Sequence, residues 1–174
     1  MEQPAFHTRD ENRGRNISDY WPLAVVIFTS AAGAYALGSG VHATTMGYMH
    51  YFMGLFLLIF AMLKLFHPSS FADGFQMYDL LAKRARGYAY AYPYIELLLA
   101  LGYLSFAMPM LVYIATIVVF GFGIVGVVAA LRKGLDINCP CMGTILSVPL
   151  STVTLSEDGA MIVMAFVMLA SYAA

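Results

Sequence analysis

Charged side chains are scarce in this sequence, and their scarcity excludes most soluble folds. Only 11% of the 174 residues are Asp, Glu, Lys or Arg, whereas roughly a quarter are charged in an average soluble domain. The formal net charge of -1 gives no basic excess for binding nucleic acid. Because 61% of the residues are hydrophobic, we predict an integral membrane protein whose main partner is the lipid bilayer.

Cysteine is rarer still, since the chain holds only Cys139 and Cys141. Two cysteines cannot build a disulfide framework. Two thiols without a nearby histidine are also an incomplete zinc site, because structural zinc takes four protein ligands. The pair is therefore interpreted either as a redox dithiol or as a two-coordinate site for a soft metal.

Long runs without charge predict where the chain crosses the membrane. Helices are expected over residues 20–37, 48–66, 93–107 and 110–131. Residues 71–92 instead mix apolar and charged side chains at helical spacing, which is typical of an amphipathic helix lying in the interface. Residues 143–155 are apolar but too short to cross, which favours a re-entrant segment. Residues 160–174 predict a short fifth span or a half-helix.

The predicted fold is all-α. It is a polytopic membrane bundle of four to five transmembrane helices, with an interfacial amphipathic helix and a short re-entrant Cys-x-Cys segment. Residues 1–19 are expected to be a flexible cytoplasmic tail, and residues 20–174 a single transmembrane domain.

The distribution of basic residues predicts the orientation. All nine Lys and Arg residues fall within three segments, namely residues 1–19, residues 64–86 and the pair Arg132 and Lys133. Four spans place these segments on one side, which the positive-inside rule identifies as cytoplasmic. We therefore expect a multi-pass protein with a cytoplasmic N-terminus.

Cys139, Pro140 and Cys141 are the strongest candidates for chemistry. Thiols at this spacing close only a small, strained disulfide ring, and strained disulfides are the more oxidising ones, which suits thiol exchange. Two thiolates with Met142 beside them also suit Cu(I). A single cysteine is more often a small buried hydrophobe. Two in one tripeptide after a basic pair, which lowers a thiol pKa, favour function.

Lys64 and Glu96 are ionisable residues within or at the ends of predicted spans, which makes them candidates for a functional buried ion pair. Two structural interpretations stay open. Lys64 near a helix end is able to extend its ammonium to the interface, and Glu96 near a helix start is able to act as a cap.

A second polar group lies near the other end of the helix predicted over residues 48–66. It comprises His42, Met46, Met49, His50 and Met53. Met46, His50 and Met53 share one helical face, which would suit Cu(I), although methionine stripes more often serve packing. Farther along, Gly121, Gly123 and Gly126 match a dinucleotide-binding pattern by letter. They lie inside a predicted span, where small residues instead let another helix approach closely.

Four short stretches together resemble a known family. They are Phe-Ala-Met-Leu-Lys-Leu-Phe at residues 60–66, Phe-Ala-Asp-Gly-Phe at 71–75, Tyr-Pro-Tyr-Ile-Glu-Leu at 92–97 and Cys-Pro-Cys-Met-Gly at 139–143. Over roughly residues 48–164 the chain is similar to the methylamine-utilisation MauE family, within the wider DoxX-like set of small helical membrane proteins.

The resemblance implies a redox helper in the bacterial inner membrane. Its client would be a disulfide-rich periplasmic enzyme like methylamine dehydrogenase, and its partner a thioredoxin-like protein. Cys139 and Cys141 would be the exchanging thiols of a membrane thiol-disulfide oxidoreductase, and Lys64 and Glu96 the buried polar pair.

Two other functions stay open at this point. One is transport or handling of Cu(I) or another soft metal, received from a metallochaperone by Cys139 and Cys141 with Met142. The other is a purely structural subunit. The residues do not identify a cofactor. Cu(I) and a quinone near Lys64 and Glu96 both stay open.

Overall fold

Every regular element in the described part of the chain is a helix. The computed structural model describes residues 20–132 and 150–173. Its helices are α1 (Trp21–Gly40), α2 (Thr45–Phe66), α3 (Pro68–Phe75), α4 (Arg86–Ser105), α5 (Pro109–Arg132) and α6 (Leu150–Ala173). No strand occurs in these residues, which confirms the all-α class.

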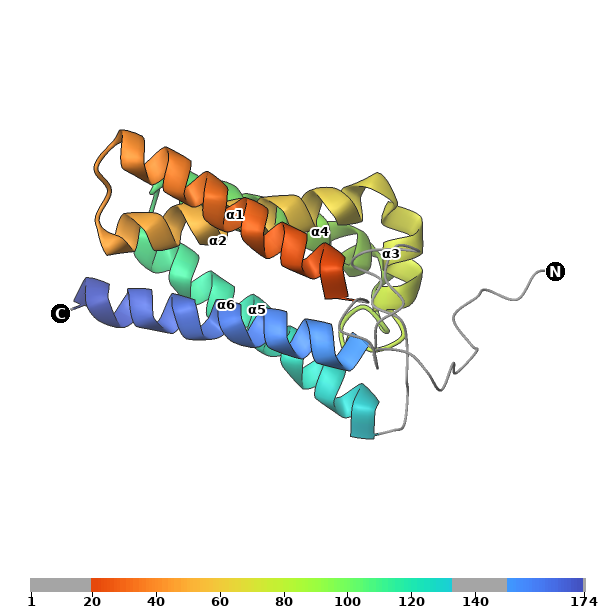
Figure 1. Ribbon diagram of the computed structural model, residues 1–174. Helices are drawn as coiled ribbons and strands as arrows, with labels where there is room; N and C mark the ends of the chain where they lie inside the picture. Colours follow the sequence, from red (N-terminus) through yellow and green to blue (C-terminus); the bar gives the residue numbers. More distant parts are fainter. Residues whose placement is uncertain (1–19, 133–149, 174) are drawn as a thin grey trace.

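Among residues 20–132 and 150–173, four helices are long and apolar enough to cross a membrane: α1, α2, α5 and the Leu155–Tyr172 part of α6. Helix α4 runs beside α2 between the same two ends of the bundle (Figure 1). Its 20 residues cover about 30 Å, the thickness of a hydrocarbon core. Because α4 carries Glu96 and five tyrosines, it is less apolar than the other long helices although it follows the same course.

The helices form two layers, with α1, α2 and α4 in one and α5 and α6 in the other (Figure 1). Side chains from both layers meet in a closed core. Among the fully buried ones are Leu57, Phe60, Tyr103, Phe120 and Met161. The outer surface is also apolar, with Phe28, Leu98, Val118 and Phe166 more than half exposed. An apolar exterior around an apolar core is what a bilayer requires.

The continuous helix predicted over residues 71–92 is divided in the structure. Helix α3 ends at Phe75, turns follow, and α4 begins at Arg86. The break has a local cause, because Asp79 Oδ1 accepts hydrogen bonds from the backbone amides of Leu81 (2.9 Å) and Ala82 (2.8 Å). The apolar stripe of this segment also faces protein, since Phe71 and Phe75 pack against the ring of Tyr92.

The last helix is longer than predicted. Helix α6 begins at Leu150, ten residues before the span expected over 160–174, and its 24 residues extend about 36 Å. Residues 150–155 of the expected re-entrant segment thus belong to a continuous helix. The remainder of that segment, residues 143–149, lies outside the described residues, as do the tail over 1–19 and the cysteine pair.

The basic residues that the structure describes gather at one end of the bundle. Lys64 lies in the last turn of α2, Lys83 and Arg84 lie in the turns after α3, Arg86 begins α4 and Arg132 ends α5. All these positions are at the end marked by α3 in Figure 1. The predicted segregation of positive charge therefore holds for this part of the chain.

Candidate functional site

A buried ion pair joins the two central helices of the first layer. The Lys64 Nζ atom donates to both carboxylate oxygens of Glu96, at 2.8 and 2.6 Å. Their side chains are only 3% and 0% exposed. Lys64 therefore does not extend to the interface, and Glu96 is a cross-helix partner rather than a helix cap. A role for the pair beyond structure stays a prediction.

Aromatic rings surround the ammonium on its other sides. The ring centroids of Phe60, Phe71 and Tyr92 lie 5.6, 5.8 and 5.4 Å from Lys64 Nζ. Ring faces carry partial negative charge, so they stabilise a cation that has been removed from water. The rings come from α2, α3 and α4, and the lysine thereby ties all three helices together.

Helix α6 adds acidic groups to the same place. Asp158 and Glu157 are 5% and 6% exposed, and the Asp158 carboxylate interacts electrostatically with both Lys64 and Glu96. A methyl group at Gly123 would lie 3.0 Å from Asp158 Oδ2, so the missing side chain on α5 makes room for the acid. The site places one ammonium among several carboxyl groups, an arrangement able to hold a proton.

The space left inside this site is small. Its cavity measures about 10 Å³, room for about one water molecule. The lining comprises Lys64, Phe71, Phe75, Tyr78, Tyr92, Gly123, Glu157 and Asp158. The ring of a quinone does not fit in such a volume. The polar site thus has no room for an organic cofactor of that size.

The turn after α3 closes the site from the bundle end. A methyl group at Gly126 would lie 3.2 Å from the Tyr78 carbonyl oxygen and 3.3 Å from the Asp79 Cα atom. Gly123 therefore permits the close approach of a helix, α6, that the glycine pattern predicted, whereas Gly126 makes room for the turn after α3 rather than for a helix. Burial raises the pKa of the Asp79 carboxyl above its usual value, although hydrogen bonds from Ala82 and Leu81 and the charge of Lys83 act in the opposite direction.

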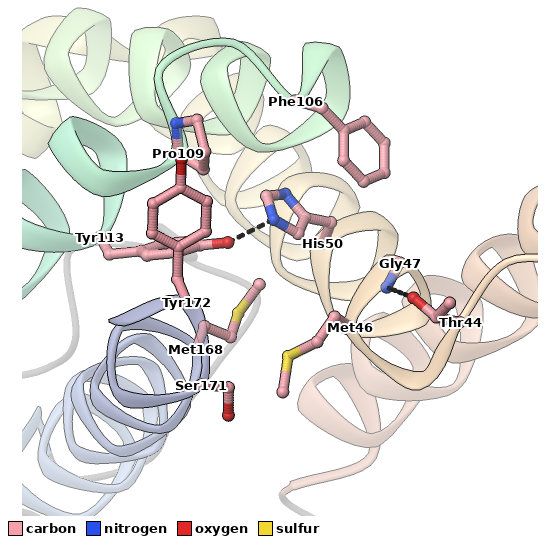
Figure 2. A pocket seen from close by; sticks show the side chains of 10 residues that line it. All are labelled: Thr44, Met46, Gly47, His50, Phe106, Pro109, Tyr113, Met168, Ser171 and Tyr172. Atoms are coloured by element: carbon pink, nitrogen blue, oxygen red, sulfur yellow. Dashed lines mark hydrogen bonds between the residues drawn. The ribbon is translucent and has the colours of Figure 1, made fainter. Parts of the chain in front are cut away.

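A second polar group lies at the opposite end of the bundle. His50 Nδ1 is 3.1 Å from the Tyr103 carbonyl oxygen, and His50 Nε2 is 2.5 Å from the Tyr113 hydroxyl. The Tyr103 hydroxyl donates to Thr116 Oγ1 at 3.1 Å, and Thr116 donates to the Val112 carbonyl oxygen at 2.8 Å. This cluster borders a cavity of about 310 Å³ (Figure 2).

The copper face predicted on α2 is only partly assembled. Met46 and His50 border the same cavity, but Met53 is fully buried in the core and does not. Both ring nitrogens of His50 already have hydrogen-bond partners. Across the part of the chain that the structure describes, no three His, Cys, Asp or Glu residues are placed to hold a metal ion.

Sequence reasoning missed the acidic residues of α6 and the tyrosine beside His50. Glu157 and Asp158 stand out as the only charges in a long apolar helix, and that was the available signal. Tyr113 gave none, since it is one of twelve tyrosines and lies 63 residues from His50. Cys139, Cys141 and Met142 lie outside the described residues, in the segment that joins α5 to α6.

Comparison with known proteins gives one match. The model of a family described as methylamine utilisation protein MauE matches residues 39–171, which include both cysteines and the whole polar site. No curated protein and no solved structure matches the chain.

Proposed function

The chain belongs to the methylamine utilisation protein MauE family, and from this premise we propose that it is a thiol-disulfide exchange protein of the bacterial inner membrane. Cys139 and Cys141 are its reactive thiols, and the client is an exported enzyme of the methylamine dehydrogenase type that needs disulfides to mature. The N-terminus of the chain lies in the cytoplasm, on the side of the basic residues, and the cysteine pair alternates its access across the membrane to reach the exported client.

The position of the cysteine segment between two fixed helix ends carries this proposal. The segment follows Arg132, the last residue of α5, and precedes Leu150, the first residue of α6. Both helix ends lie at the end of the bundle where Lys64 and Glu96 are paired (Figure 1). Asp158 and Gly123 hold α6 and α5 together one to three turns from those ends. The two helix ends that flank the cysteines in the sequence therefore lie on the same side of the bundle as the buried ion pair.

The exchange needs no group beyond a second disulfide. A client thiolate attacks one sulfur of the oxidised Cys139 and Cys141 pair, so that the other cysteine leaves as a thiolate. The second client thiolate attacks the mixed disulfide, which closes the client disulfide and leaves two electrons on the reduced pair. The two client protons pass to the two cysteines. A thioredoxin-like partner in its disulfide form accepts the electrons and protons by the same two steps and restores the pair.

Trapping the mixed disulfide tests the proposal. The variants Cys139→Ser and Cys141→Ser each retain one thiol and lack the resolving thiol, so one of them is expected to accumulate a covalent adduct in native membranes that reductant removes. The double variant is expected to form none and to leave client thiols free. Ser147→Ala, in the same segment, serves as the control and keeps wild-type exchange.

Two outcomes would contradict the proposal. Complete client disulfides in cells with the double variant would show that the pair is not needed. Stoichiometric Cu(I) binding that depends on Cys139 and Cys141, without any adduct, would assign the pair to metal handling instead.

A further inference from the structure

The cavity of about 310 Å³ lies at the end of the bundle opposite Lys64 and Glu96. Residues from α2, α5 and α6 converge on it, together with Phe106, which directly follows α4 (Figure 2). Its lining comprises Thr44, Met46, Gly47, His50, Phe106, Pro109, Tyr113, Met168, Ser171 and Tyr172. Ligand pockets occupy about 300–1,000 Å³, so this one admits a single substituted ring rather than a two-chain lipid.

The chemistry of the lining selects a neutral ligand. No Lys, Arg, Asp or Glu is among the ten residues, so neither a phosphate nor a cation finds a counter-charge there. The apolar part consists of thioethers and rings. The thioethers of Met46 and Met168 come from facing helices, and Phe106 stacks on His50 with ring centroids 4.5 Å apart (Figure 2). A flat aromatic ring is the shape such walls accept.

The hydrogen bonds around His50 determine which polar group of the lining is able to accept a hydrogen bond from a ligand. The Tyr103 carbonyl oxygen only accepts, so His50 Nδ1 carries a proton and donates it. Without an acidic partner in the lining the buried imidazole is neutral, and its Nε2 atom accepts from the Tyr113 hydroxyl. The Tyr113 oxygen has then used its proton, and its remaining lone pair accepts. This pair therefore binds a ligand hydroxyl better than a ligand carbonyl.

The surroundings of the cavity indicate how such a ligand arrives. The lining residues of α2, α5 and α6 lie at the ends of apolar spans, where a bilayer meets water. A ring held at that depth is able to keep an alkyl tail in the lipid. The ligand is accordingly a membrane-borne ring that carries hydroxyl groups.

We propose that this cavity binds the ring of a lipid-borne quinol, with a ring hydroxyl donating to Tyr113 and the ring lying between the thioethers of Met46 and Met168. Binding transfers no electrons and uses neither Cys139 nor Cys141. The inference is therefore independent of thiol exchange.

Binding of a short-tailed ubiquinol to the full chain in quinone-free lipid nanodiscs tests the proposal. Tritiated ubiquinol is displaced anaerobically by unlabelled quinol or by the matching quinone, and empty nanodiscs give the lipid background. We expect the quinol to compete about tenfold better than the quinone, the difference made by one hydrogen bond. Tyr113→Phe is expected to abolish this preference and weaken quinol binding by a similar factor.

A second variant keeps the test independent of the stability of the His50 and Tyr113 pair. Ser171 is an exposed cavity residue whose hydroxyl bonds only within its own helix, to the Val167 carbonyl oxygen. Ser171→Phe fills the cavity and is expected to abolish saturable binding, whereas Ala170→Phe, on the neighbouring exposed position, leaves it intact. Equal quinol binding by wild type and Ser171→Phe, or a preference for the quinone, would overturn the proposal.

Discussion

The Lys64 ammonium is bound by both carboxylate oxygens of Glu96, at 2.8 and 2.6 Å, inside a protein whose neighbouring side chains are apolar rings. Because so little water reaches this ion pair, each buried charge depends on the other for its stability. Removing one member deprives the other of its directly hydrogen-bonded counter-charge.

We expect Glu96→Gln to lower the free energy of unfolding by about 3–5 kcal/mol, the usual cost of removing one partner from a buried ion pair. Lys64→Met combined with Glu96→Leu should recover part of this loss, and Asp158→Asn in the same background should recover more, because Asp158 also interacts with Lys64. Reversible unfolding in mixed micelles measures the values.

The chain offers a matched control for this prediction. Arg86 and Asp73 form an ion pair of similar length, 2.7 Å, but their side chains are 60% and 55% exposed. Arg86→Ala is expected to cost less than about 1 kcal/mol. Equal losses for Glu96→Gln and Arg86→Ala would contradict the dependence on burial.

Two glycines of α5 should respond differently to alanine. A methyl group at Gly126 meets the Tyr78 carbonyl oxygen at 3.2 Å, and backbone yields poorly, so Gly126→Ala is expected to cost about 1–3 kcal/mol. Gly121 has open space, and Gly121→Ala should stabilise the helix by about 0.5–1 kcal/mol. Thermal unfolding of both variants in one detergent compares the expected loss of stability for Gly126→Ala with the expected gain for Gly121→Ala.

Asp79 should make stability depend on pH. Burial raises its pKa above the ordinary value of 3.8, so the folded protein binds this proton more tightly than the unfolded chain. The resulting stabilisation is complete below the unfolded pKa and is lost as pH rises through the folded pKa. Melting temperatures from pH 4 to 7 should therefore fall more steeply for wild type than for Asp79→Asn.

Asp79→Ala separates the charge from the turn. This variant also loses the acceptor for the amides of Leu81 and Ala82, so it should be less stable than Asp79→Asn by about 1 kcal/mol at every pH. Parallel pH profiles of the melting temperature for wild type and Asp79→Asn would show that the Asp79 pKa does not differ between the folded and the unfolded protein.

The orientation of the bundle is testable from two exposed positions. Val41 lies between α1 and α2, and Arg84 lies in the turns after α3, at opposite ends of the molecule. In a Cys139→Ser and Cys141→Ser background, Val41→Cys should react with an impermeant thiol reagent from the periplasm only. Arg84→Cys should react only after the membrane is opened. The reverse pattern would place the basic end in the periplasm.

Local sequence patterns predicted those helices whose ends coincide with helix-ending residues in the sequence. The expected helices over 20–37, 48–66 and 110–131 correspond to α1, α2 and α5, because each is a long apolar run that a glycine, a proline or a basic residue ends. Helix α4 was expected to begin at Pro93 and instead encloses it, so the proline signal gave the wrong start.

The features that the sequence patterns did not predict depend on contacts between distant parts of the chain. The last span was expected to begin at residue 160, after Glu157 and Asp158, yet these residues lie within α6, where Lys64 from another helix compensates Asp158. The stripe of Phe71 and Phe75 suggested an interface helix, but the ring of Tyr92 covers it. Spacing along one segment contains no information about such partners.

Helix α1 packs chiefly on α2 and contributes nothing to the polar site or to the cavity beside His50. The family match likewise begins at residue 39, where α1 is ending. The buried charges and the cavity beside His50 are thus built by the five helices from α2 to α6 and the turns between them, with α1 lying outside both. Substitutions on the exposed face of α1 should therefore leave the buried charges undisturbed.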